Sequence, residues 1–596
     1  MASSTGEKFN RLINAKEQIR KSINKKGVRV TEDLPFEQYA NKINNIPLYD
    51  ENLEDAGFLN FVFNYFNSNL KRPGGYSFYG NNNIVSLSAQ DITNLNRMGF
   101  SGKDSLDSAF AYCSKLVSVA PVYFNNSNSY ANLFRESKQL ETVNVTADSN
   151  FTTTERMFES CSALSNLTLN LQTSSTDTGN FTCTYMFSGV NIPDNSIASL
   201  YFPNYRNLFY GSKITSLNFL NNWDLRTNTG EAPSWDNIFY NCTNLQDFTF
   251  PTKLKYTPPY SLAYAFTSNK GLKPQAMPTL QNFFDTIDLS KVTNMTGLFS
   301  NLSENFNGLN LTIHMPAENN TCNIDNMFNK SYTFSGRGPI EYFSYDGVGS
   351  AESLFSEYSS NLDNVSYHPT TSVGTLNLPN ITKLRKAFYY NSYLTDITQI
   401  NIGDSAQDIA QMFYYCKRLT SIPLFNTKNV TDMSEMFFYC QALTTVPQFN
   451  TQKVTTMYRM FAGCTAFTTV PQFNTSNCSN FGSMFSGCTA LTTIPALDLG
   501  STINSSYWAN AYNNSYNPLY QMFYNCSNLE EIHCINIKTS LDISYSTKFT
   551  REALLEIVGN LVNVGADRTL HMGATNLAKL TAEDIAIATA KGWTLD

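Results

Sequence analysis

The sequence predicts an α/β solenoid, in which one short helix and one short strand form each turn of a single stacked coil. The main observation is a recurring motif, an apolar residue followed by Phe, found at sixteen places. Its clearest copies are 24 residues apart, at Phe413, Phe437, Phe461 and Phe485. A period between about 20 and 50 residues is typical of solenoids, in which each unit buries its apolar side only against its neighbours.

A second observation is a small or polar residue three places after the marker Phe in most units. Cys occupies this place in eight units, and Ser137 and Asn391 occupy it in two others. We expect packed, reduced thiols, because stacked helices lie about 8–10 Å apart and a disulfide needs Cα atoms within about 7 Å. The marker residues are Phe110, Phe134, Phe158, Phe187, Phe209, Phe239, Phe266, Phe299, Phe328, Phe355, Phe388, Phe413, Phe437, Phe461, Phe485 and Phe523.

The spacing within one unit predicts its two elements. The apolar residues between positions 430 and 440 follow one another at intervals of 3, 3, 1 and 3, which places them on one face of a short helix. Residues 443–449 combine apolar residues with Thr, which suits a short strand. Pro447 has no amide hydrogen and therefore limits that strand, as do the equivalent Pro423, Pro471 and Pro495.

The repeat resembles the BspA-type leucine-rich repeat, also described as a mycoplasma-lipoprotein-associated repeat, with the approximate motif NVTxMxxMFxxCxxLxxVPxFNT. Residues 429–451 match it almost throughout, and the match extends over 409–497 and 107–165. Proteins of this family are mostly surface proteins that bind host or environmental ligands. The resemblance therefore implies a leucine-rich-repeat-type solenoid with a binding role, and no catalytic residues, because the matching positions are core positions.

Residues 1–48 are expected to form a separate helical module. The string IRKSINKKGVRVTEDLPFEQYANKINNI resembles a short module at the ends of bacteriophage tail and fibre proteins, which implies docking on a partner or self-association. A simple N-terminal cap of the solenoid is the alternative. The residues expected to carry attachment or oligomerisation are Phe9, Leu12, Ile19, Ile23, Phe36, Tyr39 and Ile43.

Residues 49–548 would form the solenoid, and residues 549–596 a C-terminal cap. We expect a helix that starts at Thr550, a strand over 569–573, and a final helix opened by a capping box of Thr581 and Asp584. This ending resembles those of phage proteins with the same repeats. A cap of this kind covers the apolar end of the last unit, which a solenoid requires.

Composition and motif content exclude several classes of function. The net charge of −7 argues against nucleic acid as a partner. No run of about 18 apolar residues exists, so we expect no membrane insertion. The first residues lack the apolar core of a signal peptide. We therefore expect synthesis in a bacterial cytoplasm and a place in a virion. The four His are scattered and no nucleophile or phosphate-binding motif occurs. We therefore expect no metal, no cofactor and no enzymatic activity.

Insertions are where a ligand is expected, since packing occupies the core positions. The segment between Asp498 and Leu519 is rich in aromatic and amide side chains, which suit sugar rings, and residues 357–375 form a second candidate. Alternatively, these loops only shield the solenoid edge or contact another protein. The candidate ligand-binding residues are Tyr507, Trp508, Asn510, Tyr512, Tyr516, Tyr358, Tyr367 and His368.

These inferences favour a phage fibre or appendage protein that assembles as a homo-oligomer with other virion proteins. It would bind a host-cell or environmental glycan or protein without covalent chemistry. Two alternatives remain open: a purely architectural capsid or tail component, and a bacterial surface adhesin.

Overall fold

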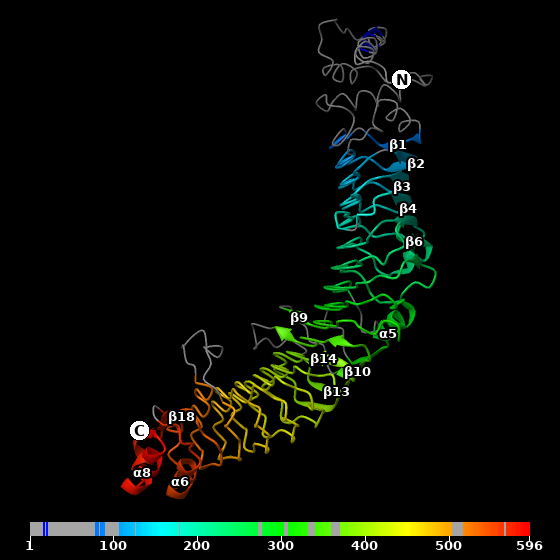
Figure 1. Cartoon of the computed structure of the whole chain (residues 1–596). Coiled ribbons are helices and arrows are strands. Elements are labelled where there is room, and N and C mark those ends of the chain that lie inside the picture. The colour runs from blue at the N-terminus through cyan, green and yellow to red at the C-terminus, as the bar shows by residue number, and fades with distance from the viewer. Residues whose placement is uncertain are drawn as a thin grey trace. The chain divides into compact units, whose positions relative to one another are not determined.

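The computed structural model describes residues 16–17, 19–21, 78–82, 84–89, 106–125, 127–177, 179–271, 277–302, 308–331, 340–358, 370–502, 517–565 and 568–596. The chain divides into two compact units, which we describe separately. Unit 1 comprises residues 1–233 and 251–257, and unit 2 comprises residues 234–250 and 258–596. Figure 1 shows that both consist of stacked turns with strands along one side. Each is a stretch of parallel solenoid of the leucine-rich-repeat type, as predicted.

Unit 1 contains one seven-stranded parallel sheet, in which the strands follow one another in chain order. Along β3 and β4 the buried residues alternate with more exposed ones, as expected when one sheet face covers the core. Pro121 lies inside β2, and the register shifts between Val119 and Val122 because Pro cannot donate to the ladder. The elements are β1 (Ser86–Leu87), β2 (Ser118–Asn125), β3 (Thr142–Ser149), β4 (Asn166–Thr173), β5 (Ile197–Tyr201), the 3-10 helix η3 (Asn218–Asn222), β6 (Trp223–Leu225) and β7 (Lys255–Tyr256).

Unit 2 begins with a four-stranded parallel sheet in the order β15-β13-β10-β8. The single longer helix near it, α5 (Met277–Thr286), is joined to β8 by Gln281, whose side chain donates to and accepts from the backbone of Thr312, both at 2.9 Å. The strands are β8 (Leu309–Ile313), β9 (Lys330–Ser331), β10 (Ile340–Tyr345), β11 (Gly349–Ser350), β12 (Glu357–Tyr358), β13 (Ser372–Leu378), β14 (Ile381–Lys383), β15 (Asp396–Ile402), β16 (Thr493–Ile494), β17 (Glu531–Ile532) and β18 (Leu541–Asp542).

The strand predicted over 443–449 is reduced to a single bridge, between Thr445 and Thr469. Over residues 403–492 the turns are joined by isolated bridges and side-chain bonds instead of extended strands. Pro423, Pro447 and Pro471 each remove one backbone donor here, which limits the strand as expected from their lack of an amide hydrogen.

The marker Phe residues form the core of both units. All sixteen are at most 3% exposed. Consecutive rings stack with centroids 5.6–5.8 Å apart from Phe110 to Phe209 in unit 1, and 5.2–6.0 Å apart from Phe239 to Phe523 in unit 2. We call these rings the Phe stack. Phe78, which the spacing did not identify, extends it by stacking on Phe110 at 5.1 Å.

The helix predicted around each marker Phe is wrong: this segment is a series of turns. Residues two before and two after the Phe have positive φ in every unit except those of Phe328 and Phe355, where only the first does. Around Phe437 they are Glu435 (φ 54°) and Tyr439 (φ 57°). Alternate amides consequently bond to the neighbouring turn, as when Phe437 N–H donates to the carbonyl of Met460 at 2.9 Å. Bonds between turns thus replace those within a helix.

The Cys position has a role beyond its small size. In seven units the thiol donates to the carbonyl of the Phe in the preceding turn, for example Cys440 to Phe413 at 3.1 Å and Cys464 to Phe437 at 3.0 Å. Ser137 and Asn391 donate to the equivalent carbonyls at 3.1 and 2.9 Å. All twelve Cys are buried and none forms a disulfide, and burial raises the pKa of Cys113 and Cys526 to about 12. In these nine units the position holds a side chain that donates a hydrogen bond to the preceding turn.

The predicted elements of the C-terminal segment are confirmed. The Thr550 hydroxyl accepts from Ala553 N–H at the start of α6 (Arg551–Gly559), and Thr581 and Asp584 form the capping box of α8 (Ala582–Ala590). Between them lie β19 (Arg568–His571) and α7 (Ala574–Leu577), and β20 (Trp593–Leu595) closes a parallel sheet in the order β18-β19-β20. Arg551 joins α6 to α8 through two bonds to the Asp584 carboxylate, at 2.8 and 2.9 Å.

Most of the predicted N-terminal module lies outside the described residues. Positions 16–17 and 19–21 are helical, in agreement with the predicted helical module, and Ile19 is buried. The predicted boundaries at 48 and 548 stay predictions. Within the described residues, no helix has both the length and the apolarity needed to cross a bilayer.

A pH-sensitive contact joins α6 of the C-terminal segment to the preceding turn. His533 Nδ1 lies 2.8 Å from Glu556 Oε1, and its Nε2 lies 3.5 Å from Glu531 Oε2. The hydrogen bond to Glu556 is the main cause that raises the pKa of His533 above its ordinary value. This contact adds stability that is complete below the unfolded-state pKa and is lost as pH rises through the folded-state pKa. We expect Glu556→Gln to lower the His533 pKa more than Glu531→Gln does, measured by NMR titration. Equal shifts would contradict the assignment.

Candidate ligand-binding surface

In three consecutive turns of unit 2, the two residues after the marker Phe are aromatic and lie at the surface. We name these six residues the surface aromatic ladder. Five of them are half-buried, and Tyr439 is 37% exposed. The ladder consists of Tyr389, Tyr390, Tyr414, Tyr415, Phe438 and Tyr439.

The rings form two parallel columns. In the first, Tyr414 stacks between Tyr389 and Phe438 with centroids 4.6 Å apart on each side. In the second, Tyr415 stacks between Tyr390 at 4.8 Å and Tyr439 at 5.0 Å. Backbone bonds between turns fix this spacing, as when Tyr415 N–H donates to the Phe438 carbonyl at 2.7 Å. The ladder is therefore rigid without support from a ligand.

Because each ring covers the face of the next, the ladder presents ring edges and hydroxyl groups. The hydroxyls of Tyr414, Tyr415 and Tyr439 make no hydrogen bond within the described part of the chain and are not sealed from solvent. The second column ends at Gly463, which has a φ of +79°. A Cβ atom there would lie 2.9 Å from the Tyr439 ring, so this ring closes over a glycine.

Basic side chains border the ladder. Lys386 Nζ lies 5.4 Å from the Tyr389 ring centroid, and Lys417 Nζ lies 5.4 Å from that of Tyr415. Neither ammonium group has a carboxylate within 4.0 Å among the described residues. Arg459 lies 5.8 Å from the Phe438 ring but is also 3.6 Å from Glu435.

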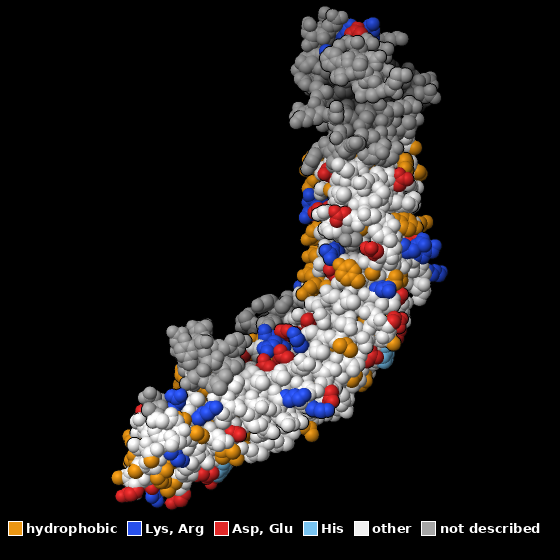
Figure 2. Space-filling view, viewed as in Figure 1, with side chains coloured by type: hydrophobic (Ala, Val, Ile, Leu, Met, Phe, Trp, Pro, Cys, Tyr) orange, Lys and Arg blue, Asp and Glu red, His pale blue; other side chains and the backbone are white. Residues whose placement is uncertain are grey.

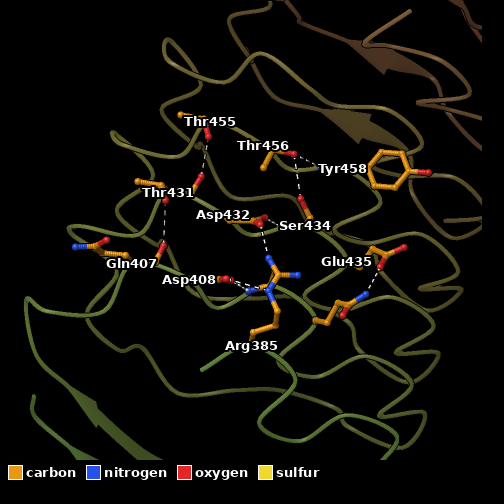
Figure 3. Close-up of polar contacts among 12 residues, drawn as sticks. Arg385, Gln407, Asp408, Thr431, Asp432, Ser434, Glu435, Thr455, Thr456 and Tyr458 are labelled. Carbon is orange, nitrogen blue, oxygen red and sulfur yellow. Dashed lines mark hydrogen bonds and ion pairs between the residues drawn. The ribbon is translucent and has the colours of Figure 1, made fainter. Parts of the chain in front are cut away.

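The acidic groups beside the ladder have structural partners. Figure 3 shows Arg385 between Asp408 and Asp432, with its Nε 2.9 Å from the first and its terminal nitrogen 2.7 Å from the second. The other oxygen of Asp432 accepts from Ser434 N–H at 2.8 Å, the bond that defines an Asx turn. Glu435 accepts from Gln411 as well as pairing with Arg459. These carboxylates stabilise the turns and are not open to a ligand.

Hydroxyl side chains form a second, regular array close by. Thr431 donates to the Gln407 carbonyl at 3.2 Å and Thr455 donates to the Thr431 carbonyl at 3.1 Å, as Figure 3 shows. Each hydroxyl is thereby bonded to the turn before it. The array holds the turns together. On the face drawn in Figure 2, the described residues show scattered charged side chains among backbone and uncharged groups.

Most predicted site residues lie outside the described part of the chain. This holds for Tyr507, Trp508, Asn510, Tyr512, Tyr516, Tyr367 and His368, and for Phe9, Leu12, Ile23, Phe36, Tyr39 and Ile43. Tyr358 is described by its backbone alone, as the last residue of β12. Its neighbour Glu357 donates its N–H to the Tyr389 carbonyl at 2.8 Å, so the first residue of the second predicted insertion lies beside the ladder.

The sequence contains a signal for the ladder that the repeat analysis did not use. The marker Phe is followed by Tyr-Tyr, Tyr-Tyr and Phe-Tyr in the units of Phe388, Phe413 and Phe437. Three consecutive aromatic pairs at the same two positions indicate a column of side chains along the solenoid. In the described ranges, no three His, Cys, Asp or Glu side chains are grouped so that they could hold a metal ion.

Two family models match the chain. Residues 106–215 match the BspA type Leucine rich repeat region (6 copies). Residues 261–378, 361–446, 382–496 and 407–531 match the family described as Mycoplasma protein of unknown function, DUF285. The chain thus contains BspA-type leucine-rich repeats, as their motif led us to expect. These matches indicate a surface or adhesion-type repeat protein.

Similar solved structures include a leucine-rich repeat protein from Bacteroides ovatus, which is 15% identical with a TM-score of 0.25, over 64% of this chain and 82% of that one. Another is the TLR13–ssRNA13 complex, which is 10% identical with a TM-score of 0.18, over 78% of this chain and 85% of that one. Scores this low say nothing about the function of this chain. No curated protein is significantly similar to it.

Proposed function

We propose that this chain is a non-enzymatic fibre or appendage protein of a bacteriophage virion that binds a surface-displayed ligand through the surface aromatic ladder. The observation that carries the binding role is the rigid stacking of the ladder at 4.6–5.0 Å. A surface whose side chains are already ordered loses little conformational entropy when a ligand binds. The carboxylates of Asp408, Asp432 and Glu435 already have partners within the chain, which favours binding over hydrolysis.

The virion assignment rests on the two ends of the sequence, which resemble segments of phage proteins. Its expected partners are other virion proteins, further copies of this chain and a host-surface glycan or protein. An architectural virion component and a bacterial adhesin are the alternatives. An antibody against the repeats should label an external appendage of the particle, whereas labelling of the bacterial envelope alone would favour the adhesin.

The binding role is tested with the full chain on bacterial cells. We expect the double variant Tyr414→Ala/Tyr415→Ala to bind at least about tenfold more weakly, since truncation of interface aromatics typically costs more than about 1 kcal/mol each. The matched control is Tyr123→Ala, which removes a 45% exposed Tyr on β2 in unit 1. Circular dichroism verifies the fold of both variants. Equal binding by the ladder variant and the wild type would refute the proposal.

A further inference from the structure

Residues 381–465, which contain the ladder, form a basic region in an acidic chain. They hold eight Lys and Arg (383, 385, 386, 417, 418, 428, 453 and 459) and five Asp and Glu (396, 404, 408, 432 and 435), a difference of +3 against −7 for the whole chain. The excess of positive charge is not spread evenly over this region. Most of its acidic side chains pair with particular cations, so the excess resides on the remaining ones. Arg385 joins Asp408 and Asp432, Arg459 joins Glu435, and Lys428 joins Asp404 at 2.8 Å.

Two of the five cations in this region that have no carboxylate partner among the described residues lie at the ladder. Lys386 and Lys417 lie at its rings in two successive turns, and Arg418 lies 4.2 Å from the ring of Tyr393. No ion pair of these three side chains is present among the described residues. Positive charge therefore recurs along the ladder from one turn to the next.

The aromatic rings, like the basic side chains, favour a negatively charged ligand. An aromatic ring is negative on its faces and positive at its edge, and in this ladder neighbouring rings cover the faces. The ligand consequently meets ring edges, phenol O–H donors and ammonium groups, all of which attract oxygen-rich, negatively charged groups. The two columns run across three turns, so the surface suits a chain whose negative groups repeat.

Building on the proposed function, we propose that the ladder binds an acidic polysaccharide, a sugar chain with repeating carboxylate or sulfate groups. Single-stranded nucleic acid is disfavoured, because bases bind by stacking on open aromatic faces and both faces of Tyr414 and Tyr415 are covered by neighbouring rings. An acidic peptide added as a strand is disfavoured too, because the backbone donors here already bond to neighbouring turns, as Tyr390 N–H does to the Tyr414 carbonyl at 2.8 Å.

The test measures binding of the full chain to polygalacturonate, chondroitin sulfate, neutral dextran, polyglutamate and oligo-dT by calorimetry. We expect binding to the first two alone, weakened by added salt because the Debye length is only about 8 Å at physiological ionic strength. Comparison of polygalacturonate with chondroitin sulfate distinguishes carboxylate from sulfate. Stronger binding to dextran, polyglutamate or oligo-dT would overturn the proposed ligand class.

The second arm uses the variant Lys386→Gln/Lys417→Gln. We expect it to lose affinity for the acidic polysaccharide by about tenfold, the scale of two exposed charge pairs, while Lys386→Arg/Lys417→Arg retains it. Lys115→Gln/Lys213→Gln, which removes two exposed lysines of unit 1, is the matched control and should bind normally. If the tyrosine variant loses cell binding and the Lys386/Lys417 variant keeps full affinity, the ladder is the site but the ligand is not acidic. If neither loses binding, the proposed function itself fails.

Discussion

Replacement of Phe437 by Ala is expected to lower the free energy of local unfolding by about 3–5 kcal/mol, the range for truncation of a buried aromatic. The ring is fully buried and stacks between Phe413 and Phe461 at 5.6 Å on each side. Its loss leaves a cavity that the neighbouring turns cannot fill, because backbone bonds fix their separation. A solenoid is stabilised by contacts between neighbours, so hydrogen exchange of the adjacent turns measures the effect directly.

The matched control for this substitution is the next residue, since Phe438 has the same side chain on the opposite side of the backbone. Phe438 is half-buried and stacks on Tyr414 at 4.6 Å. We expect Phe438→Ala to cost about 1 kcal/mol of stability, in proportion to the smaller area it buries, and to weaken ligand binding instead. Similar stability losses in the two variants would contradict the division between the Phe stack and the surface aromatic ladder.

The core could be predicted because one residue type marks it in every unit. Phe209, Phe299 and Phe355 retain little of the motif apart from the Phe, and all three are buried in the Phe stack. Phe78 escaped recognition because the polar Ser77 precedes it, where every other copy has an apolar residue. Recurrence therefore predicts the interior well where the motif is kept and misses a Phe that lacks it.

The backbone between these core residues could not be predicted from apolar spacing. A helix and a series of turns both place residues at intervals of three and four toward the interior, so the pattern does not distinguish them. The distinguishing signal is the residue type at the two positions with positive φ, where Asn and Gly are favoured. Asn207 with Gly211, and Asn237 with Asn241, occupy these positions in two successive units.

The incorrect helix prediction also explains why the candidate site was not recognised from the sequence. On a helix, consecutive residues diverge by about 100° around the axis, so the two residues after the Phe would not form one surface. In the turns, positive φ at the second of them brings the pair together, and the rings of Tyr414 and Tyr415 lie 5.2 Å apart. The aromatic pairs were visible in the sequence, but their arrangement in two adjacent columns follows from backbone geometry alone.

Gly374→Ala is expected to destabilise unit 2 by about 4 kcal/mol or more, the scale of exceptional single substitutions. Gly374 lies in β13, and a Cβ atom there would lie 2.2 Å from the Glu341 carbonyl oxygen in β10. That oxygen belongs to the backbone, so relief requires the two strands to separate and break the pairing of Tyr342 with Thr375.

Gly559→Ala is the control with the opposite expected sign. Gly559 is the last residue of α6 and has no atom within 4 Å of an added Cβ, so alanine should stabilise the helix by about 0.5–1 kcal/mol. Thermal unfolding and hydrogen exchange of β10 and β13 would measure both. If Gly374→Ala left the hydrogen exchange of these strands unchanged, the close approach of β13 to β10 could not be what requires glycine. If both variants changed the free energy of unfolding in the same direction, backbone entropy would outweigh the contact.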